Sequence, residues 1–284
     1  MKYLLIFLLV SSSAFCDVYS DTMVRAIQNH WTFDFKVPAH PYATGFVRHA
    51  GVREHAIYAG IVPAANLPTH FDLTSTLTPV KDQGMCGGCW AFATVGVIEN
   101  FPYTNLSSPL SLSEQDIIDC DTQSQGCNGG DFDGFDYAKN GLASEQDYPF
   151  AGQNQTCQTN HKKDAKVVTW AFVSGAENTE PTVDQIKTAL YQTKAPVAVG
   201  IYAAFDLQMY NGGVFNSCSQ GQIDHMVDVV GWDDTDNDWI VRNSWGQSWG
   251  ENGYFRILRT DSSGAKCNSI GTESAYLANA TLVN

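Results

Sequence analysis

The sequence predicts an α+β protein with a mostly helical first half, an antiparallel sheet in the second half and a cleft between them. Two patterns support this class. Between residues 89 and 140, apolar side chains recur at helical spacing, whereas beyond residue 166 the apolar segments are rich in β-branched and aromatic residues. With 284 residues and 44% hydrophobic content, the chain can form one substantial domain or two half-domains that share an interface.

The start of the chain has the pattern of a secretory signal. Lys2 precedes an apolar run over residues 3–10, and small residues follow up to Cys16. This run is shorter than the roughly 20 apolar residues that a membrane-spanning helix needs, and no later stretch approaches that length. We therefore expect residues 1–16 to be a signal peptide, with cleavage after Cys16, and we expect no membrane span.

Residues 17–65 differ in composition from the rest of the chain. They lack cysteine and their charges nearly cancel, while Pro38, Pro41 and Gly45 interrupt any regular element. Residues 66–68 then offer an extended junction that a protease could cut, because the residue before a proline avoids the helical region. We interpret residues 17–65 as a removable leader, or propeptide, and residues 66–284 as the main domain.

Three helices are expected in the first half of the main domain. The first spans residues 89–100, with Val95 and Ile98 on its buried stripe. The second opens at Ser111 or Ser113, because either hydroxyl can cap a helix whose first turn is acidic. The third spans residues 131–140 and ends at the glycine that follows.

The second half is expected to form five strands, with one helix between the first two. The helix covers residues 182–193, where apolar side chains return to helical spacing. The strands cover residues 167–172, 195–199, 225–230, 239–242 and 253–258.

The charge of the chain excludes some partners. A formal net charge of −14 and an isoelectric point near 4.7 give a surface that repels nucleic acid and anionic membranes. An acidic compartment suits such a chain, since protonation of carboxylates reduces its self-repulsion. We expect a location on the secretory route, either a lysosome-like vacuole or the extracellular space.

The cysteine count predicts one unpaired thiol. The chain has eight cysteines, and removal of a signal peptide that ends at Cys16 leaves an odd number. On an oxidising route, six of these would form three disulfides and one would stay free. Glycosylation sequons begin at Asn105, Asn154 and Asn279, which fits the same route.

Cys89 is the candidate nucleophile. It follows a glycine-rich turn and starts an apolar helix, where unpaired backbone N–H groups favour the thiolate and lower the thiol pKa. The spacing from Cys86 also fits a structural disulfide, a metal-binding pair or a redox dithiol. This stretch alone leaves these alternatives open.

The second half supplies partners for a thiol nucleophile, which needs a base and a group that orients the base. His225 lies in a predicted strand, and Asn243 follows another predicted strand. An Asn243 amide could hold the imidazole of His225, and Trp245 could shield that bond from water. A single histidine on an apolar strand is more often a core residue, so the combination with Cys89 carries the argument.

Five separated blocks together resemble the papain family of cysteine proteases. They are residues 83–92, 113–115 with 119–120, 126–130, 224–225 and 243–246. The resemblance extends over about residues 67–276. It implies a papain-like two-lobed fold, with a helical N-terminal lobe, an antiparallel β-barrel-like C-terminal lobe and an active-site cleft between them.

The resemblance also implies roles for individual residues. Cys89 would be the nucleophile and His225 its proton partner in a thiolate–imidazolium pair, with Asn243 orienting the imidazole. The side-chain amide of Gln83 and the backbone N–H of Cys89 would form the oxyanion hole. The implied activity is endopeptidase cleavage through a thioester acyl-enzyme. The implied disulfides are Cys86–Cys127, Cys120–Cys157 and Cys218–Cys267, which leave Cys89 free.

The same resemblance implies substrate subsites. Gly129 and Gly130 would pair with an extended substrate backbone. The pocket for the P2 residue, the second residue before the cleaved bond, would be surrounded by Asp131, Phe132, Gly200, Ile223, Met226 and Glu273. Glu273 on the pocket floor would admit arginine beside hydrophobic residues. One extra residue after Cys267 leaves Thr272 as the alternative occupant of that floor.

Some positions depart from the family pattern. Gly88 replaces the usual serine before the nucleophile, Met226 is larger than the usual neighbour of the histidine, and the short leader lacks the long helical signature of cathepsin L-like enzymes. No insertion with paired histidines precedes Pro149, which implies an open cleft and endopeptidase action. The expected partners are protein or peptide substrates, the leader as inhibitor and cystatin-like inhibitors. We expect a monomer without cofactor or metal.

Two other classes remain as alternatives. A redox protein would use Cys86 and Cys89 as a dithiol. A non-catalytic binding or storage protein would not require reactive side chains at Cys89, His225 and Asn243.

Overall fold

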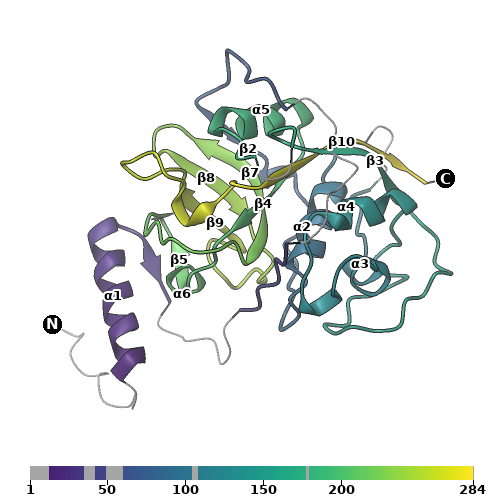
Figure 1. Ribbon diagram of the computed structural model, residues 1–284, viewed down its shortest axis with the longest axis horizontal. Coiled ribbons are helices and arrows are strands. Elements are labelled where there is room, and N and C mark those ends of the chain that lie inside the picture. The colour runs from purple at the N-terminus through teal and green to yellow at the C-terminus, as the bar shows by residue number, and fades with distance from the viewer. Residues whose placement is uncertain (1–12, 35–41, 49–59, 104–107, 177–178, 284) are drawn as a thin grey trace.

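The computed structural model describes residues 13–34, 42–48, 60–103, 108–176 and 179–283, with side chains from residue 20 onward. A lobe built on a sheet and a mostly helical lobe lie side by side, with α2 (Cys89–Glu99) where they meet (Figure 1). The predicted α+β class and the order of its two halves are thus confirmed.

Helix α2 is central to the molecule. All of its residues are buried, as expected for a helix that is apolar on every side. It contacts β4, β7 and β10 of the sheet lobe and also α3 (Glu114–Cys120) and α4 (Asp133–Tyr137) of the helical lobe. The first residue of α2, Cys89, therefore lies at the boundary between the lobes.

Polar side chains set the start of the two other helices. The hydroxyl of Ser113 accepts the N–H of Asp116 at 2.9 Å, so Ser113 is the cap of α3. Helix α4 is shorter than predicted, because the carboxylate of Asp131 accepts the N–H of Asp133 at 3.0 Å and holds residue 131 outside the helix. A 3₁₀ segment, Ala138–Asn140, completes the predicted range.

The sheet has the strand order β3-β10-β4-β7-β8-β9-β6, and β2 pairs with β7. Its pairings are antiparallel except for β6 with β9, and among the described strands it is an open sheet rather than a barrel. The five predicted strands and the helix α5 (Val183–Thr193) are present. The strands are β2 (His70–Asp72), β3 (Ala165–Phe172), β4 (Val197–Ile201), β6 (Val214–Phe215), β7 (His225–Asp233), β8 (Asp238–Arg242), β9 (Tyr254–Leu258) and β10 (Ser274–Leu282).

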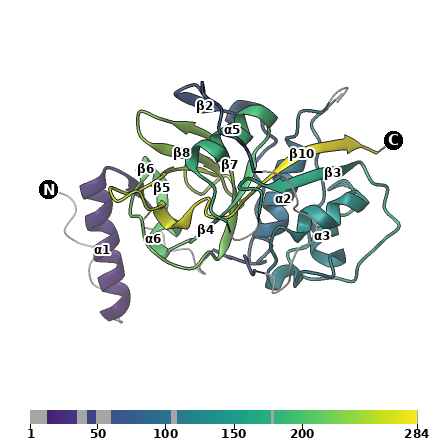
Figure 2. The same cartoon turned by 45° about the horizontal axis from the view of Figure 1, so that its top comes forward.

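Described residues of the predicted leader are part of this fold. Helix α1 (Ser13–Asn29) stands beside the sheet lobe, away from the helical lobe (Figures 1 and 2). After it, β1 (Thr32–Phe33) pairs with β5 (Tyr210–Gly212), which precedes β6 and follows α6 (Phe205–Gln208). The side chain of Trp31 is 3% exposed and packs on Phe215 with ring centroids 5.0 Å apart. Helix α1 includes residue 16, after which cleavage of the signal peptide is expected. That cleavage remains a prediction.

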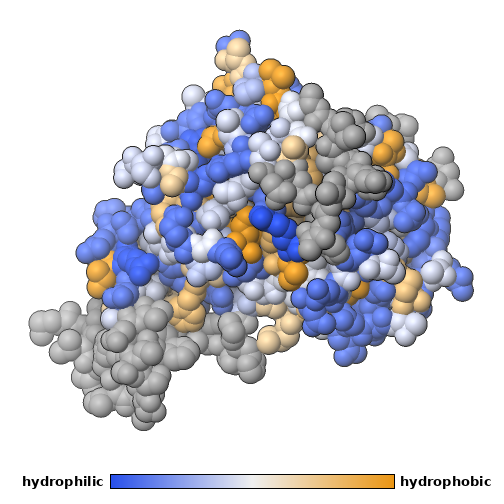
Figure 3. All heavy atoms as spheres, in the orientation of Figure 1, coloured by the Kyte–Doolittle hydropathy of each residue, from blue (hydrophilic) through white to orange (hydrophobic). Residues whose placement is uncertain are grey.

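The surface in view is largely hydrophilic, with small separate apolar areas (Figure 3). In the described part of the chain, no helix combines the length and apolar character that crossing a membrane requires.

Candidate active site

Cys89 is fully buried at the first turn of α2. The turn before it is held by the disulfide Cys86–Cys127, and a β-carbon on Gly88 would lie 3.0 Å from Ile118 Cδ1. The other bonded pairs are Cys120–Cys157 and Cys218–Cys267, so all three pairs are those that the family resemblance implies. Among the described side chains, Cys89 is the free cysteine.

The imidazole of His225 is held in one orientation. Its Nε2 lies 2.9 Å from Asn243 Oδ1, which also accepts the backbone N–H of Ser244 at 2.8 Å. That N–H identifies the Asn243 atom as the oxygen, so His225 Nε2 carries the proton. Trp245 stacks on the imidazole with centroids 4.7 Å apart.

The other ring nitrogen of His225 remains available. His225 Nδ1 has no hydrogen-bond partner among the described residues. His225 begins β7, which packs against α2, and the N–H of the next residue, Met226, donates to the Cys89 thiol. A neutral imidazole with a bare Nδ1 can accept a proton from a neighbouring thiol.

Gln83 presents its amide to the cleft. Nε2 donates to the carbonyl oxygens of Cys86 and Ala43 at 2.9 and 3.0 Å, and Oε1 accepts the hydroxyl of Ser244 at 2.5 Å. Trp245 Nε1 donates to the same Ala43 oxygen at 3.2 Å. Ala43 belongs to the predicted leader. Its carbonyl oxygen therefore accepts a hydrogen bond from the Gln83 amide, which is the group expected to bind the oxyanion.

Residues 42–48 of the predicted leader lie between the two lobes. Gly130 N–H donates to Gly45 O at 3.0 Å, and Val47 N–H donates to Gly130 O at 2.9 Å. Phe46 and Gly130 thus form an isolated parallel β-bridge. Gly45 N–H also donates to Asp224 O, beside His225, at 3.0 Å. This leader segment covers the Cys89 end of α2.

Two leader side chains contact the predicted P2 pocket. The ring of Phe46 is buried and packs edge-on against Phe132, with centroids 5.9 Å apart. Arg48 forms an ion pair with Glu273, which is 8% exposed. Thr272, the alternative floor residue, instead donates its hydroxyl to Ser269 O.

The remaining predicted pocket residues lie around these contacts. Gly200 on β4 pairs with Met226 on β7, and a β-carbon on Gly200 would lie 2.8 Å from Ile223 Cγ2. A β-carbon on Gly129 would lie 2.4 Å from the side chain of Val47 in the leader. Asp131 is buried beside Phe132. The structure thus brings the predicted pocket residues to one region, together with the leader.

Burial shifts the pKa values of Cys89 and His225 in the directions opposite to those that an ion pair would need. Burial raises the pKa of Cys89 to about 12, although N–H groups of Met226, Gly45 and Trp90 oppose the shift. Burial also lowers the pKa of His225 to about 4. These directions favour a neutral thiol and a neutral imidazole while residues 42–48 cover the site, and the thiolate–imidazolium pair remains a prediction.

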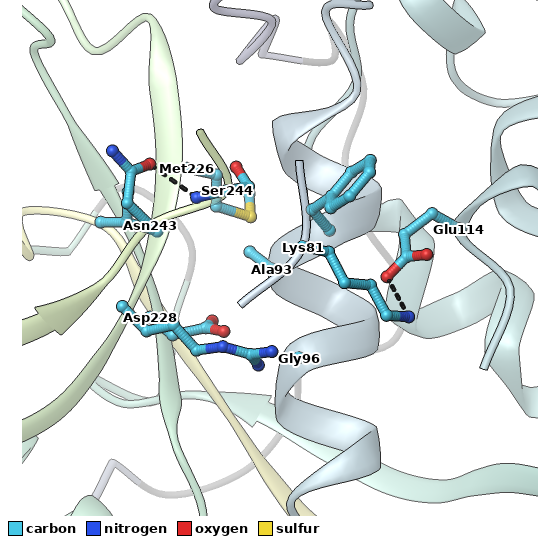
Figure 4. Close-up of a pocket in the computed structure, with 11 residues that line it drawn as sticks. Lys81, Ala93, Gly96, Glu114, Met226, Asp228, Asn243 and Ser244 are labelled. Atoms are coloured by element: carbon cyan, nitrogen blue, oxygen red, sulfur yellow. Dashed lines mark hydrogen bonds and ion pairs between the residues drawn. The ribbon is translucent and has the colours of Figure 1, made fainter. Parts of the chain in front are cut away.

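Ionisable side chains surround a cavity of about 20 Å³ that lies between α2 and the sheet (Figure 4). Lys81 Nζ bonds Glu99 and Glu114, each at 2.8 Å. Asp228 and Arg242 lie against Gly96 of α2, where a β-carbon would be 2.3 Å from Asp228 Oδ2. Burial raises the pKa of Glu114 and of Asp228 to about 8.

Sequence reasoning missed these buried groups. The available signal was a charged residue within an apolar run, as with Asp228 in a predicted strand and Glu99 at the end of a predicted apolar helix.

Two of the sequon asparagines are exposed. Asn154 accepts the N–H of Cys127 at 2.6 Å through Oδ1, and Asn279 lies on β10. Asn105 lies outside the described residues. Within the described ranges, no group of three or more His, Cys, Asp or Glu side chains is placed to hold a metal ion.

The fold and site together define a two-lobed α+β protein of the thiol protease class, with Cys, His and Asn side chains at the contact between the lobes. Residues 67–278 match the sequence profile described as papain family cysteine protease. The chain belongs to this family.

Individual relatives agree with this membership. The chain is 35% identical over 243 residues to a viral cathepsin of Heliothis zea nuclear polyhedrosis virus, covering 81% of this chain and 64% of that protein. It is 39% identical over 228 residues to the thiol protease SEN102 of Hemerocallis sp., covering 76% of this chain and 60% of that protein. The chain thus spans less than two thirds of the length of these relatives.

Solved structures match different shares of the chain. The bromelain protease from Ananas comosus, in complex with the E64 inhibitor, matches with a TM-score of 0.65 and 32% identity, covering 74% of this chain and 99% of that chain. Digestive procathepsin L2 from Tenebrio molitor larval midgut matches with a TM-score of 0.76 and 25% identity, covering 94% of this chain and 90% of that chain.

Proposed function

We propose that this chain is the latent form of a cysteine endopeptidase that hydrolyses peptide bonds. The observation that carries the proposal is the arrangement of His225. Asn243 holds one ring nitrogen, and the other nitrogen is free beside the strand residue that bonds the Cys89 thiol. A peptide segment already lies along this site, which suits a cleft that binds extended chains.

The proposed reaction begins when substrate replaces the leader. His225 Nδ1 takes the proton of the Cys89 thiol, and Asn243 Oδ1 stabilises the resulting imidazolium through Nε2–H. The thiolate attacks the peptide carbonyl, and the oxyanion accepts hydrogen bonds from Gln83 Nε2 and Cys89 N–H. The imidazolium then protonates the leaving amine, and water hydrolyses the thioester.

The leader is the proposed inhibitor. Its parallel bridge to Gly130 fills the backbone site that a substrate would use, and the Ala43 carbonyl occupies the Gln83 amide. Latency has a second cause in the leader-covered form, since the Cys89 thiol with a pKa of about 12 is a poor nucleophile at neutral pH. Leader removal would admit water to the cleft and let the thiolate–imidazolium pair form.

The proposed P2 preference is for hydrophobic residues and for arginine. The leader supports it, because Phe46 bridges Gly130 and packs on Phe132 while Arg48 pairs with Glu273. We propose that the protein follows the secretory route to a vacuole or the exterior. There it would act as a monomer on protein or peptide substrates, under control of its leader and of cystatin-like inhibitors.

Active-site titration tests the proposal. E-64 should label one thiol per chain after leader removal, and Cys89→Ala should abolish both labelling and cleavage of a Phe-Arg reporter peptide. Ser248→Ala, an exposed change in the loop after Trp245, is the matched control and should keep both. Activity retained by Cys89→Ala would contradict the mechanism. Loss of Arg-Arg cleavage with retention of Phe-Arg cleavage in Glu273→Ala would support the P2 proposal.

A further inference from the structure

The side chain of Asn154 bonds the backbone of Cys127, next to the active-site turn. Asn154 Oδ1 accepts the N–H of Cys127 at 2.6 Å. The carbonyl oxygen of Cys127 accepts the N–H of Gly87 at 2.9 Å, and its sulfur is bonded to Cys86. Asn154 is therefore connected through one residue to the turn that precedes Cys89.

Asn154 also lies close to Gly126. This glycine is buried with a φ of 60°, and a β-carbon on it would lie 2.3 Å from Asn154 Oδ1. Glycine adopts this left-handed conformation without strain and leaves room for the amide. The carbonyl oxygen of Gly126 accepts the indole N–H of Trp90 at 3.1 Å. Trp90 and Asn154 therefore hold the C=O and the N–H of one peptide group, which joins Gly126 to Cys127.

The loop that carries Asn154 is attached to helix α3 on both sides of this residue. The carbonyl oxygen of Gln153 accepts the side-chain amide of Gln115 at 2.8 Å. The N–H of Gln155 donates to Asp119 Oδ1 at 2.7 Å. A disulfide joins the end of the loop to the same helix. The backbone at Asn154 is thus already ordered, so its side chain loses little further entropy when it forms a bond.

The turn that Asn154 supports ends at Gly130, where the leader pairs. The N–H and the carbonyl oxygen of Gly130 both form hydrogen bonds with the leader, at residues 45 and 47. We propose that Asn154 is a positioning residue whose Oδ1 fixes the turn of residues 126–130, so that Gly130 presents its backbone to an extended peptide. This proposal rests on the proposed function, in which that peptide is the substrate.

Loss of the Asn154 bond should affect substrate binding rather than the chemical step. The pairing at Gly130 involves the backbone of the bound peptide and is the same before and during the attack of the thiol. KM should therefore rise while kcat stays near the wild-type value. The hydrogen bond between His225 and Asn243 does not involve this turn, so the pH profile of kcat/KM should not move.

Asn154 also begins a glycosylation sequon, and the two roles can be separated. A glycan would be joined to Nδ2, whereas Cys127 bonds Oδ1. Thr156→Ala removes the sequon and keeps the Asn154 side chain. Asn154→Asp removes the sequon and keeps an oxygen acceptor. Asn154→Ala removes both the sequon and the acceptor.

The experiment compares the wild type with these three variants. Each is made as the full chain in a secretory host, freed of its leader and normalised by E-64 titration. We expect Asn154→Ala to raise KM for a Phe-Arg reporter peptide about fivefold with kcat unchanged, which is the size expected for the loss of one hydrogen bond. Thr156→Ala and Asn154→Asp should stay within about twofold of the wild type.

Two further readouts separate positioning from a general structural defect. Iodoacetamide reaches Cys89 without pairing at Gly130, so its rate should be equal in all four proteins. A synthetic peptide of residues 42–48 should inhibit Asn154→Ala about fivefold more weakly than the wild type, because it would pair with Gly130 as the leader does. An unchanged KM in Asn154→Ala, an equal rise in Thr156→Ala, no recovery in Asn154→Asp or slower alkylation would each overturn the role of Asn154. Activity retained by Cys89→Ala would instead overturn the proposed function itself.

Discussion

Substitution of Asp228 by asparagine should make the protein more stable at neutral pH. Asp228 is 3% exposed on β7, and Oδ1 has no hydrogen-bond partner among the described residues. The charged groups that act on it are Arg242 of β8, which favours its charge, and Glu99 of α2, which opposes it. Burial, assisted by Glu99, outweighs Arg242 and raises the pKa from its ordinary value of 3.8 to about 8.

The sign and size of the effect follow from proton linkage. Between these two pKa values, folded Asp228 holds a proton that the unfolded chain has lost, so the folded state loses stability as pH rises. The slope for one such group is about 1.4 kcal/mol per pH unit, which sums to about 3 kcal/mol between about pH 5 and pH 7. Asparagine has the shape of the protonated acid and does not titrate, so Asp228→Asn lacks this loss.

Urea unfolding followed by circular dichroism at several pH values measures the difference. The free energy of unfolding of Asp228→Asn should exceed that of the wild type by an amount that grows by about 3 kcal/mol between about pH 5 and pH 7. Asp147→Asn, an exposed change, should keep the wild-type slope. Parallel curves for Asp228→Asn and the wild type would show that Asp228 is ionised in the folded protein, which would refute the reasoning.

Three further expectations concern α2 and the leader. Gly96→Ala should lower the free energy of unfolding by about 2 kcal/mol in urea titrations, because its methyl group would lie 2.3 Å from Asp228 Oδ2; an unchanged midpoint would contradict the packing. In the full-length chain, Phe46→Ala should speed E-64 labelling about tenfold by loosening the leader, whereas Val62→Ala, at an 80% exposed leader position, should not. Iodoacetamide labelling of Cys89 in the full-length chain should rise about tenfold per pH unit from about pH 7 to pH 9, because its thiol has a pKa of about 12; a plateau below about pH 7 would show that an ion pair already exists beneath the leader.

The features that the sequence predicted well depend on local signals. The start of α2 at Cys89 follows from a glycine turn joined to an apolar segment, and the cap of α3 follows from Ser113 before an acidic first turn. Strand β7 is a continuous apolar run apart from His225, Asp228 and its last residue, Asp233. Each of these signals lies within about ten residues, so no distant contact is needed to interpret it.

The features that it missed depend on distant partners. Strand β10 is rich in alanine and polar residues, and its pairing with β3 shifts register near Asn279, so no alternating pattern identifies it. The path of residues 42–48 is set by Gly130, Asp224 and Trp245, all far along the chain. The raised pKa of Cys89 follows from burial under that segment, which only the assembled fold contains.

The pairing of β1 with β5 and the burial of Trp31 have a consequence for the proposed activation, which would depend on concentration. A cut at the junction near residue 66 would break one peptide bond and leave every one of these contacts intact. The severed leader would stay bound as a ligand of the enzyme, held by a sheet edge, an indole ring and the cleft. Activity would then follow the dissociation equilibrium of a two-chain complex, so dilution or digestion of the released leader, rather than cleavage alone, would set how much enzyme is free to act.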